Sequence, residues 1–420
     1  MKKKSYKSFL RSASIALVRA QRPIRIISSI HIPDRVKKRF LARKFKRLPR
    51  YEYPPLRWNA SQRKEMFVDI QSKLDKSNPI ENMIYNTCAE YILTIRMLES
   101  RGTMDFFKYS KDLFGYPDYC YVGGNVSILD LANHIQKGFD GIEFPEDPDT
   151  NFSDERIDSA DARDLLLAYL EDIFPNRKIK VVISNRMTAD AAAGADYIKL
   201  KKSATYTRRQ VYQLLHHEGE VHLATTLNGA SQGVLKFLAK GTPRTTIYQE
   251  GLAVFAEFMS QQIDPIRVKK LAYRTIAIKM CEEGADFIDL YNFYLENNFG
   301  EPESFDAAAR CIRGGLMEGG APFTKDVAYL DGLVRINNFI RVALKKGRPE
   351  LVRFLFTGKL IAENVPILYE LSQKGIVKPP QYLPGWIKDM RYLVTLFNFS
   401  AFMDLINLSE VEDHYSKIMS

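Results

Sequence analysis

The sequence predicts an α+β fold that is mostly helical, with a small sheet directly before a histidine-rich helix. Apolar residues recur at helical spacing in residues 61–115 and again through most of the chain after residue 207. Two short runs between these regions, Lys178–Ser184 and Asp196–Ala204, are typical of strands. Hydrophobic residues make up 45% of the 420 residues and charged residues 26%, which is the composition of a globular protein.

The first 50 residues differ strongly in charge from the rest of the chain. They hold 17 Lys and Arg residues and a single acid, Asp34, whereas residues 51–420 carry a small negative balance. The Pro-containing stretch Arg50–Trp58 follows, and we place a boundary there between a basic N-terminal arm (1–50) and one main domain (51–420). Two interpretations of the arm stay open. It is either a solvated, partly helical tail or a segment that binds an acidic partner such as nucleic acid, anionic lipid or an acidic protein tail.

Several local signals mark where the predicted helices begin and end. The helical pattern of Glu81–Gly102 stops at its glycine, and Pro175 closes the pattern of Asn151–Phe174. Asp264 followed by Pro265 is a favourable start for a later helix, because Asp caps a helix and Pro fits its first position. The later stretch Lys378–Trp386 is rich in proline.

The second predicted strand has one apolar and one polar face. Ile198 and Leu200 alternate with Tyr197, Lys199 and Lys201, as expected of a half-exposed edge strand. An edge strand can accept an extended peptide through its free backbone groups. The segment Tyr197–Lys202 is therefore a candidate docking strand for a peptide.

The cysteines and the hydropathy exclude several protein classes. The four cysteines are scattered and form no CxxC pair, which argues against a disulfide framework or a cysteine-based zinc site and favours a reducing, cytoplasmic location. No run of about eighteen apolar residues exists, so no transmembrane segment is expected. The apolar stretch Ala13–Val18 is too short for a secretory leader.

The stretch HHEGEVH, residues 216–222, is the main candidate for chemistry. His217 and Glu218 begin a pattern close to the zinc-peptidase signature H-E-x-x-H, but His222 comes one residue late. In a regular α-helix two residues five apart are separated by roughly 140° and cannot share a metal. A π-bulge, which Gly219 makes easier, brings both rings to one face.

The residues alone do not decide two further questions about this site. His216 and Glu220 lie four apart and form an alternative pair, and all these polar groups are also compatible with an ordinary helix. A catalytic zinc needs a third protein ligand besides two histidines. Glu250 begins a strongly apolar helical stretch, where a carboxylate needs a cation, and Glu257 lies two turns later as a rival ligand or a supporting group.

The motifs together resemble a known family. HEGEVH is followed by QEGLA at Gln249–Ala253, and further matches are RCIRGGLMEGGAPFTKDVAYLDG (Arg310–Gly332), LFTGK (Leu355–Lys359) and PPQYLPGW (Pro379–Trp386). The chain is thus similar, over roughly residues 60–408, to the QEGLA-motif proteins, which include the microtubule-associated tyrosine carboxypeptidases. The resemblance implies a zincin-like metallopeptidase with one zinc ion per chain, held by His217, His222 and Glu250, and Glu218 as the general acid/base.

A carboxypeptidase needs groups beyond the metal site. Lys325 and Tyr329 are candidates to stabilise the oxyanion that forms during hydrolysis. Arg244, Arg310 and Arg313, together with Lys325, are candidates to bind the terminal carboxylate of the substrate.

The sequence therefore predicts a zinc-dependent peptidase acting on a peptide or protein C-terminus, most consistent with a carboxypeptidase that removes a C-terminal aromatic residue. One alternative is a zinc endopeptidase or processing protease. Another is a non-catalytic binding or regulatory protein that zinc stabilises.

Overall fold

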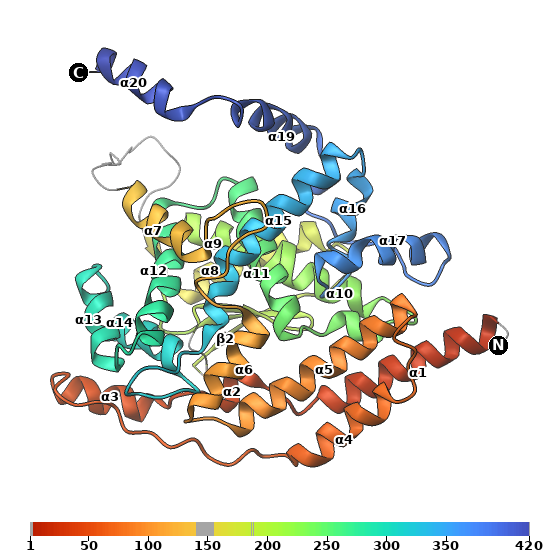
Figure 1. Cartoon of the computed structure of the whole chain (residues 1–420), viewed down its shortest axis with the longest axis horizontal. Helices are drawn as coiled ribbons and strands as arrows, with labels where there is room; N and C mark the ends of the chain where they lie inside the picture. Colours follow the sequence, from red (N-terminus) through yellow and green to blue (C-terminus); the bar gives the residue numbers. More distant parts are fainter. Residues whose placement is uncertain (1–2, 140–154, 186, 188, 420) are drawn as a thin grey trace.

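The computed structural model describes residues 3–139, 155–185, 187 and 189–419. As the sequence predicts, it is mostly helical with small sheets. The long helix α11 (Pro243–Met259) runs through the centre of the molecule, and α15 (Ala328–Lys345) packs along it (Figure 1). These two helices cross where a Cβ atom on Gly251 would lie 2.0 Å from the carbonyl carbon of Gly332. Two glycines are thus required for this close approach, which fixes the position of Glu250 next to them.

The N-terminal part consists of helices, of which α1 packs against α4 and α5. Asn78 caps α5 through hydrogen bonds to the backbone N–H groups of Ile80 and Glu81, and the chain leaves the helix at Gly102, which has a positive φ of 77°. The helices of this part are α1 (Lys3–Gln21), α2 (Ile26–Ser29), α3 (Asp34–Ala42), α4 (Ala60–Gln71), α5 (Pro79–Glu99), α6 (Met104–Phe114) and α7 (Ile128–Gly138).

The first 50 residues are not a solvated tail, so that interpretation is wrong. Leu10, Leu17 and Ile30 are fully buried in the same core cluster as residues of α5 and α11. Ser14, also buried, accepts a hydrogen bond from the backbone N–H of Phe237, more than 200 residues away. Leu10, Ser14 and Leu17 are spaced as one face of a helix, and the many basic residues around them hide this pattern.

The sheets are small, and their strands lie between α7 and the histidine-rich stretch 216–222 in the sequence. Strand β4 (Tyr197–Lys201) pairs in parallel with β2 (Lys180–Ser184) and antiparallel with β3 (Ala191–Ala193), which gives the order β2-β4-β3. A two-stranded sheet joins β1 (Arg156–Ile157) to β5 (Tyr206–Thr207). The prediction that Tyr197–Lys202 is an edge strand is wrong, because β4 is central. Its alternation reflects one buried face, which edge and central strands share.

Helix α8 (Ser159–Ile173) packs on β2, within the helical stretch predicted from Asn151; residues 151–154 of that prediction lie outside the described residues. Asp264 caps α12 as predicted, through a hydrogen bond from the Arg267 N–H. The C-terminal elements are α12 (Pro265–Glu282), α13 (Phe287–Glu296), α14 (Glu301–Ile312), η3 (Thr324–Val327), α16 (Pro349–Phe354), η4 (Ala362–Asn364), α17 (Val365–Gln373), α18 (Gly385–Lys388), α19 (Arg391–Met403) and α20 (Leu408–Met419).

Helix α19 begins against α15, and α20 lies away from the body of the molecule (Figure 1). Within the described residues, no single helix has the length and apolar character needed to cross a membrane. The pair α19 and α20, bent by 86°, meets that test only when taken together. The four cysteines are all unpaired, and a cytoplasmic location stays a prediction.

Candidate metal centre

The histidine-rich stretch forms a π-helix, as the spacing of its histidines requires. The helix η1 (Leu215–Leu223) continues α9 (Arg208–Leu214) and leads into α10 (Ala224–Ala230). The i→i+5 spacing brings His217 and His222 to one face, with ring centroids 4.9 Å apart. The predicted distortion is confirmed, and it extends over nine residues rather than a single bulge.

The surroundings of η1 support its unusual geometry. Thr225 donates a hydrogen bond to the Val221 carbonyl at 2.7 Å, and Thr226 donates one to the His222 carbonyl at 2.7 Å. A Cβ atom on Gly219 would approach Leu170 of α8 to 3.1 Å. Gly219 therefore also permits close packing of α8 against the π-helix.

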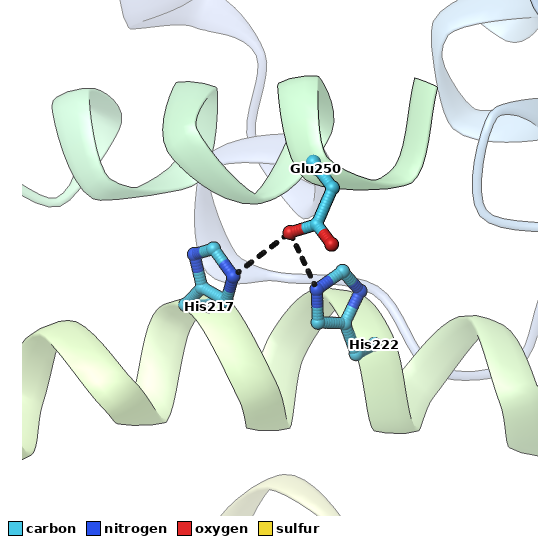
Figure 2. A group of neighbouring side chains, drawn as sticks. All are labelled: His217, His222 and Glu250. Carbon is cyan, nitrogen blue, oxygen red and sulfur yellow. Dashed lines mark ion pairs between the residues drawn. The ribbon is translucent and has the colours of Figure 1, made fainter. Parts of the chain in front are cut away.

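Glu250 completes a triad with the two histidines. Its Oε2 atom lies 3.6 Å from Nε2 of His217 and 3.6 Å from Nε2 of His222 (Figure 2). The three candidate ligand atoms all lie within 4.8 Å of one another. Ligands about 2.0–2.2 Å from a tetrahedral zinc ion are separated by roughly 3.3–3.6 Å, so the group fits such an ion.

Glu257 contacts His217 but is not a member of the triad. It is fully buried, and its Oε1 atom lies 2.6 Å from Nδ1 of His217. Gln213 donates to the same carboxylate, and Arg267 binds it through two N–H groups at 2.9 and 3.1 Å. When the His217 Nδ1–H donates to Glu257, Nε2 presents its lone pair to the metal position.

The charge state of Glu257 follows from these contacts. Burial raises the pKa of the Glu257 carboxyl, but Arg267 and His217 outweigh this and hold it below its usual range. Burial likewise disfavours protonated His217, yet its hydrogen bonds with Glu250 and Glu257 raise its pKa to about 10. The pair of carboxylates thus makes this position attractive to a cation.

The second oxygen of Glu250 is held by Lys325, whose Nζ lies 2.9 Å from Oε1. Burial raises the pKa of Glu250, but Lys325 and the two histidines hold it well below its usual range. The ammonium group proposed as an oxyanion or carboxylate partner is therefore bound to a candidate metal ligand. Tyr329, the other oxyanion candidate, is buried, with its ring centre 5.1 Å from the Lys325 Nζ.

Glu218 lies on the same π-helix and contacts the sheet. Its Oε2 accepts a hydrogen bond of 2.7 Å from the backbone N–H of Ala193 in β3. His216 and Glu220 form a separate pair at 2.6 Å and do not join the triad.

Lys359, the last residue of the LFTGK motif, lies next to the triad and was not a candidate from the sequence. Its ammonium donates to the His222 carbonyl at 3.0 Å and to the Gln249 side chain at 2.7 Å. Burial lowers the pKa of Lys359 to about 7, while Glu218 and Glu250 act in the opposite direction.

The three candidate anchoring arginines have different surroundings. Arg310 binds Asp326 through two N–H groups at 2.8 and 3.0 Å, and Arg313 is buried at the end of α14. Arg244 is exposed in the first turn of α11, where its backbone N–H bonds to Glu90. Arg267 contacts Glu257 and Arg274 contacts the Tyr329 ring. Neither residue was a candidate from the sequence, although their seven-residue spacing on the predicted helix after Asp264 places them on one face.

Comparisons with known proteins identify the family. No curated protein matches the chain. A crystal structure of a proposed lipoprotein from Colwellia psychrerythraea is similar at 12% sequence identity and a TM-score of 0.42, over 75% of this chain and 68% of the other, which does not establish a shared fold. The zincin-like fold therefore stays a prediction.

The model of the microtubule-associated tyrosine carboxypeptidase family matches residues 38–405. The match confirms the resemblance found in the motifs, and it begins earlier than residue 60, within the basic N-terminal segment. Because it covers most of the chain, the protein belongs to the microtubule-associated tyrosine carboxypeptidase family.

Proposed function

We propose that the protein is a zinc-dependent carboxypeptidase that removes an aromatic residue from the C-terminus of a peptide or protein in the cytoplasm. Its family implies a carboxypeptidase. The observation that carries the zinc dependence is the triad of His217, His222 and Glu250, with one carboxylate oxygen 3.6 Å from both imidazole nitrogens. Two histidines and one carboxylate are a common ligand set of catalytic zinc.

Zinc bound by this triad would act as a Lewis acid and lower the pKa of a coordinated water molecule. We assign Glu218 the role of accepting the proton of the attacking water and delivering it to the leaving amine. The Ala193 N–H holds one Glu218 oxygen at 2.7 Å and so fixes the carboxylate. The Glu257 and Lys325 side chains hold His217 and Glu250 in place.

The peptide backbone is proposed to bind along β3 rather than along β4. Within the described residues, β3 pairs with β4 alone, and it also contacts η1. The peptide would add along the β3 edge that β4 does not occupy. The Ala193 N–H is already bound to Glu218, so a peptide on β3 would use the remaining backbone groups of the strand and lie close to the proposed base.

The test compares Glu218→Gln with the matched control Glu220→Gln on the same helix. Glu218→Gln keeps the shape of the side chain but removes the proton acceptor. We therefore expect turnover to fall by at least a hundredfold while zinc is retained. Glu220 pairs with His216 outside the triad, so its variant should keep both zinc and most of its activity. The Glu250→Ala variant should lose zinc.

Activity is measured by mass spectrometry of peptides ending in Tyr or Phe, and zinc by elemental analysis. Turnover by Glu218→Gln equal to wild type would contradict the mechanism. Cleavage at internal bonds of the substrate peptide would favour the alternative that the protein is an endopeptidase. Bound zinc without cleavage of any peptide would favour the alternative of a non-catalytic binding or regulatory protein that zinc stabilises.

A further inference from the structure

The region behind Glu250 contains more cations than carboxylates. Three pairs are complete: Lys325 binds Glu250, Arg267 binds Glu257, and Arg310 binds Asp326. Two further guanidinium groups in the same region, those of Arg274 and Arg313, have no carboxylate partner within the part of the chain that the structure describes. This surplus of positive charge lies beside the proposed catalytic centre.

Arg274 is connected to that centre through an aromatic ring. Its guanidinium lies 4.9 Å from the ring centre of Tyr329, and the Lys325 ammonium lies 5.1 Å from the same ring centre. Lys325 in turn binds Glu250. Burial lowers the pKa of Arg274, followed by repulsion from Arg310, while the Asp326 charge acts against this. The Tyr329 ring is thus contacted both by the partly buried Arg274 and by Lys325, which binds the candidate metal ligand Glu250.

Arg313 is an even less compensated charge. Arg313 is only 7% exposed, and its buried Nε–H has no hydrogen-bond partner among the described residues. Its guanidinium lies 5.6 Å from the ring centre of Phe323. Burial lowers its pKa to about 10, and repulsion from Arg310 and Arg274 contributes. Guanidinium N–H groups that are buried without an acceptor are costly, so a bound anion is the expected partner.

Arg310 is less suited to bind a ligand than these two residues. Its planar fork is already occupied by both oxygens of Asp326. Arg244 is exposed at the far end of α11, seven residues before Gly251 at the crossing with α15. The two arginines without carboxylates are the ones that can form new charge-assisted hydrogen bonds.

We propose that Arg274 and Arg313 together bind the α-carboxylate of the C-terminal residue of the substrate. This inference rests on the proposed carboxypeptidase function and names the residues that select a free C-terminus. A planar guanidinium matches a carboxylate through two parallel N–H groups, so the pair selects a free acid over an amide. The rings of Phe323 and Tyr329 hold the two guanidinium groups from the side.

The experiment measures kcat and KM of the zinc-loaded enzyme on two peptides that end in tyrosine, one with a free acid and one amidated. Wild type should prefer the acid by at least tenfold in kcat/KM. Arg274→Gln and Arg313→Gln should each raise KM for the acid by about tenfold with a smaller change for the amide, so that the preference falls. Lys270→Gln is the matched control, because Lys270 lies on α12 but pairs with Glu303. It should keep the full preference.

A second measurement separates this inference from the proposed function. Calorimetry on the Glu218→Gln protein with N-acetyltyrosine and its amide reports carboxylate binding without catalysis. Free-acid binding that disappears with Arg274→Gln or Arg313→Gln supports the anchor even if no peptide is cleaved. Inorganic phosphate that binds equally well would instead indicate a general anion site and overturn the assignment. An unchanged preference for the free acid in both arginine variants, provided that they fold and retain zinc, would also overturn the assignment.

Discussion

The candidate metal centre differs in the pairing of its buried charges from the neighbouring region that contains Arg274, Arg310 and Arg313, here called the arginine region. The two carboxylates at the triad have partners within the protein: Glu257 binds His217, Gln213 and Arg267, and Glu250 binds Lys325. In the arginine region, Arg310 has a partner, whereas Arg274 and Arg313 bind no carboxylate of the described chain. Satisfied groups hold ligands in place, and unsatisfied groups remain available for a substrate.

The largest expected effect comes from breaking a satisfied pair in the arginine region. Arg310→Gln leaves the Asp326 carboxylate, which is 4% exposed, without its bidentate partner. Breaking such a pair costs about 3–5 kcal/mol of unfolding free energy. Arg313→Gln removes a buried charge that has no carboxylate partner, so its loss of stability should be much smaller. Denaturant unfolding of both variants measures the difference, and equal losses would contradict the distinction between paired and unpaired arginines.

A smaller effect is expected at the support of the metal centre. Glu257→Gln removes the carboxylate that orients His217 but leaves all three candidate ligands in place. The loss of such a partner typically weakens metal affinity by about 10–100-fold. Competition with a zinc chelator measures this, and Glu220→Gln serves as the control. If zinc affinity is unchanged, the hydrogen bond to Nδ1 does not position His217.

The candidate metal centre could be predicted from the sequence because its two histidines follow a local pattern. The five-residue spacing of His217 and His222 required a distorted helix, and η1 provides it. Whether Glu250 or Glu257 belonged to the triad depended on which faced the imidazoles, which the apolar pattern of α11 does not reveal. The family resemblance indicated Glu250, and the contacts agree.

The arginine region could not be predicted in the same way, because a missing partner is a property of the folded chain. Arg274 and Arg313 come from α12 and the end of α14, and nothing in either segment shows which arginine meets a carboxylate. The same limit explains two errors in the fold. The central position of β4 depends on β3, which is three residues long, and the burial of Leu10 and Leu17 was hidden by the surrounding basic charge.

The smallest effect is expected at Arg244, an arginine that the sequence made a candidate but whose surroundings differ from those of Arg313. Its side chain is exposed, and the hydrogen bond from this residue to Glu90 comes from its backbone N–H, which any non-proline substitution keeps. Arg244→Gln should therefore change the unfolding free energy by less than about 0.5 kcal/mol. It should also leave the preference for free-acid over amidated peptides within about twofold, because an exposed charge is screened by water and salt.

The informative quantity is the ratio of the effects of Arg244→Gln and Arg313→Gln on that preference, measured with the same two peptides. Both changes remove one positive charge, so a general electrostatic attraction for an anionic peptide predicts equal losses that fade together at high salt. A buried guanidinium that contacts the carboxylate directly predicts a loss confined to Arg313→Gln that persists at high salt. A loss of preference in Arg244→Gln as large as in Arg313→Gln would therefore show that selection of the free C-terminus does not depend on buried, unpaired arginines.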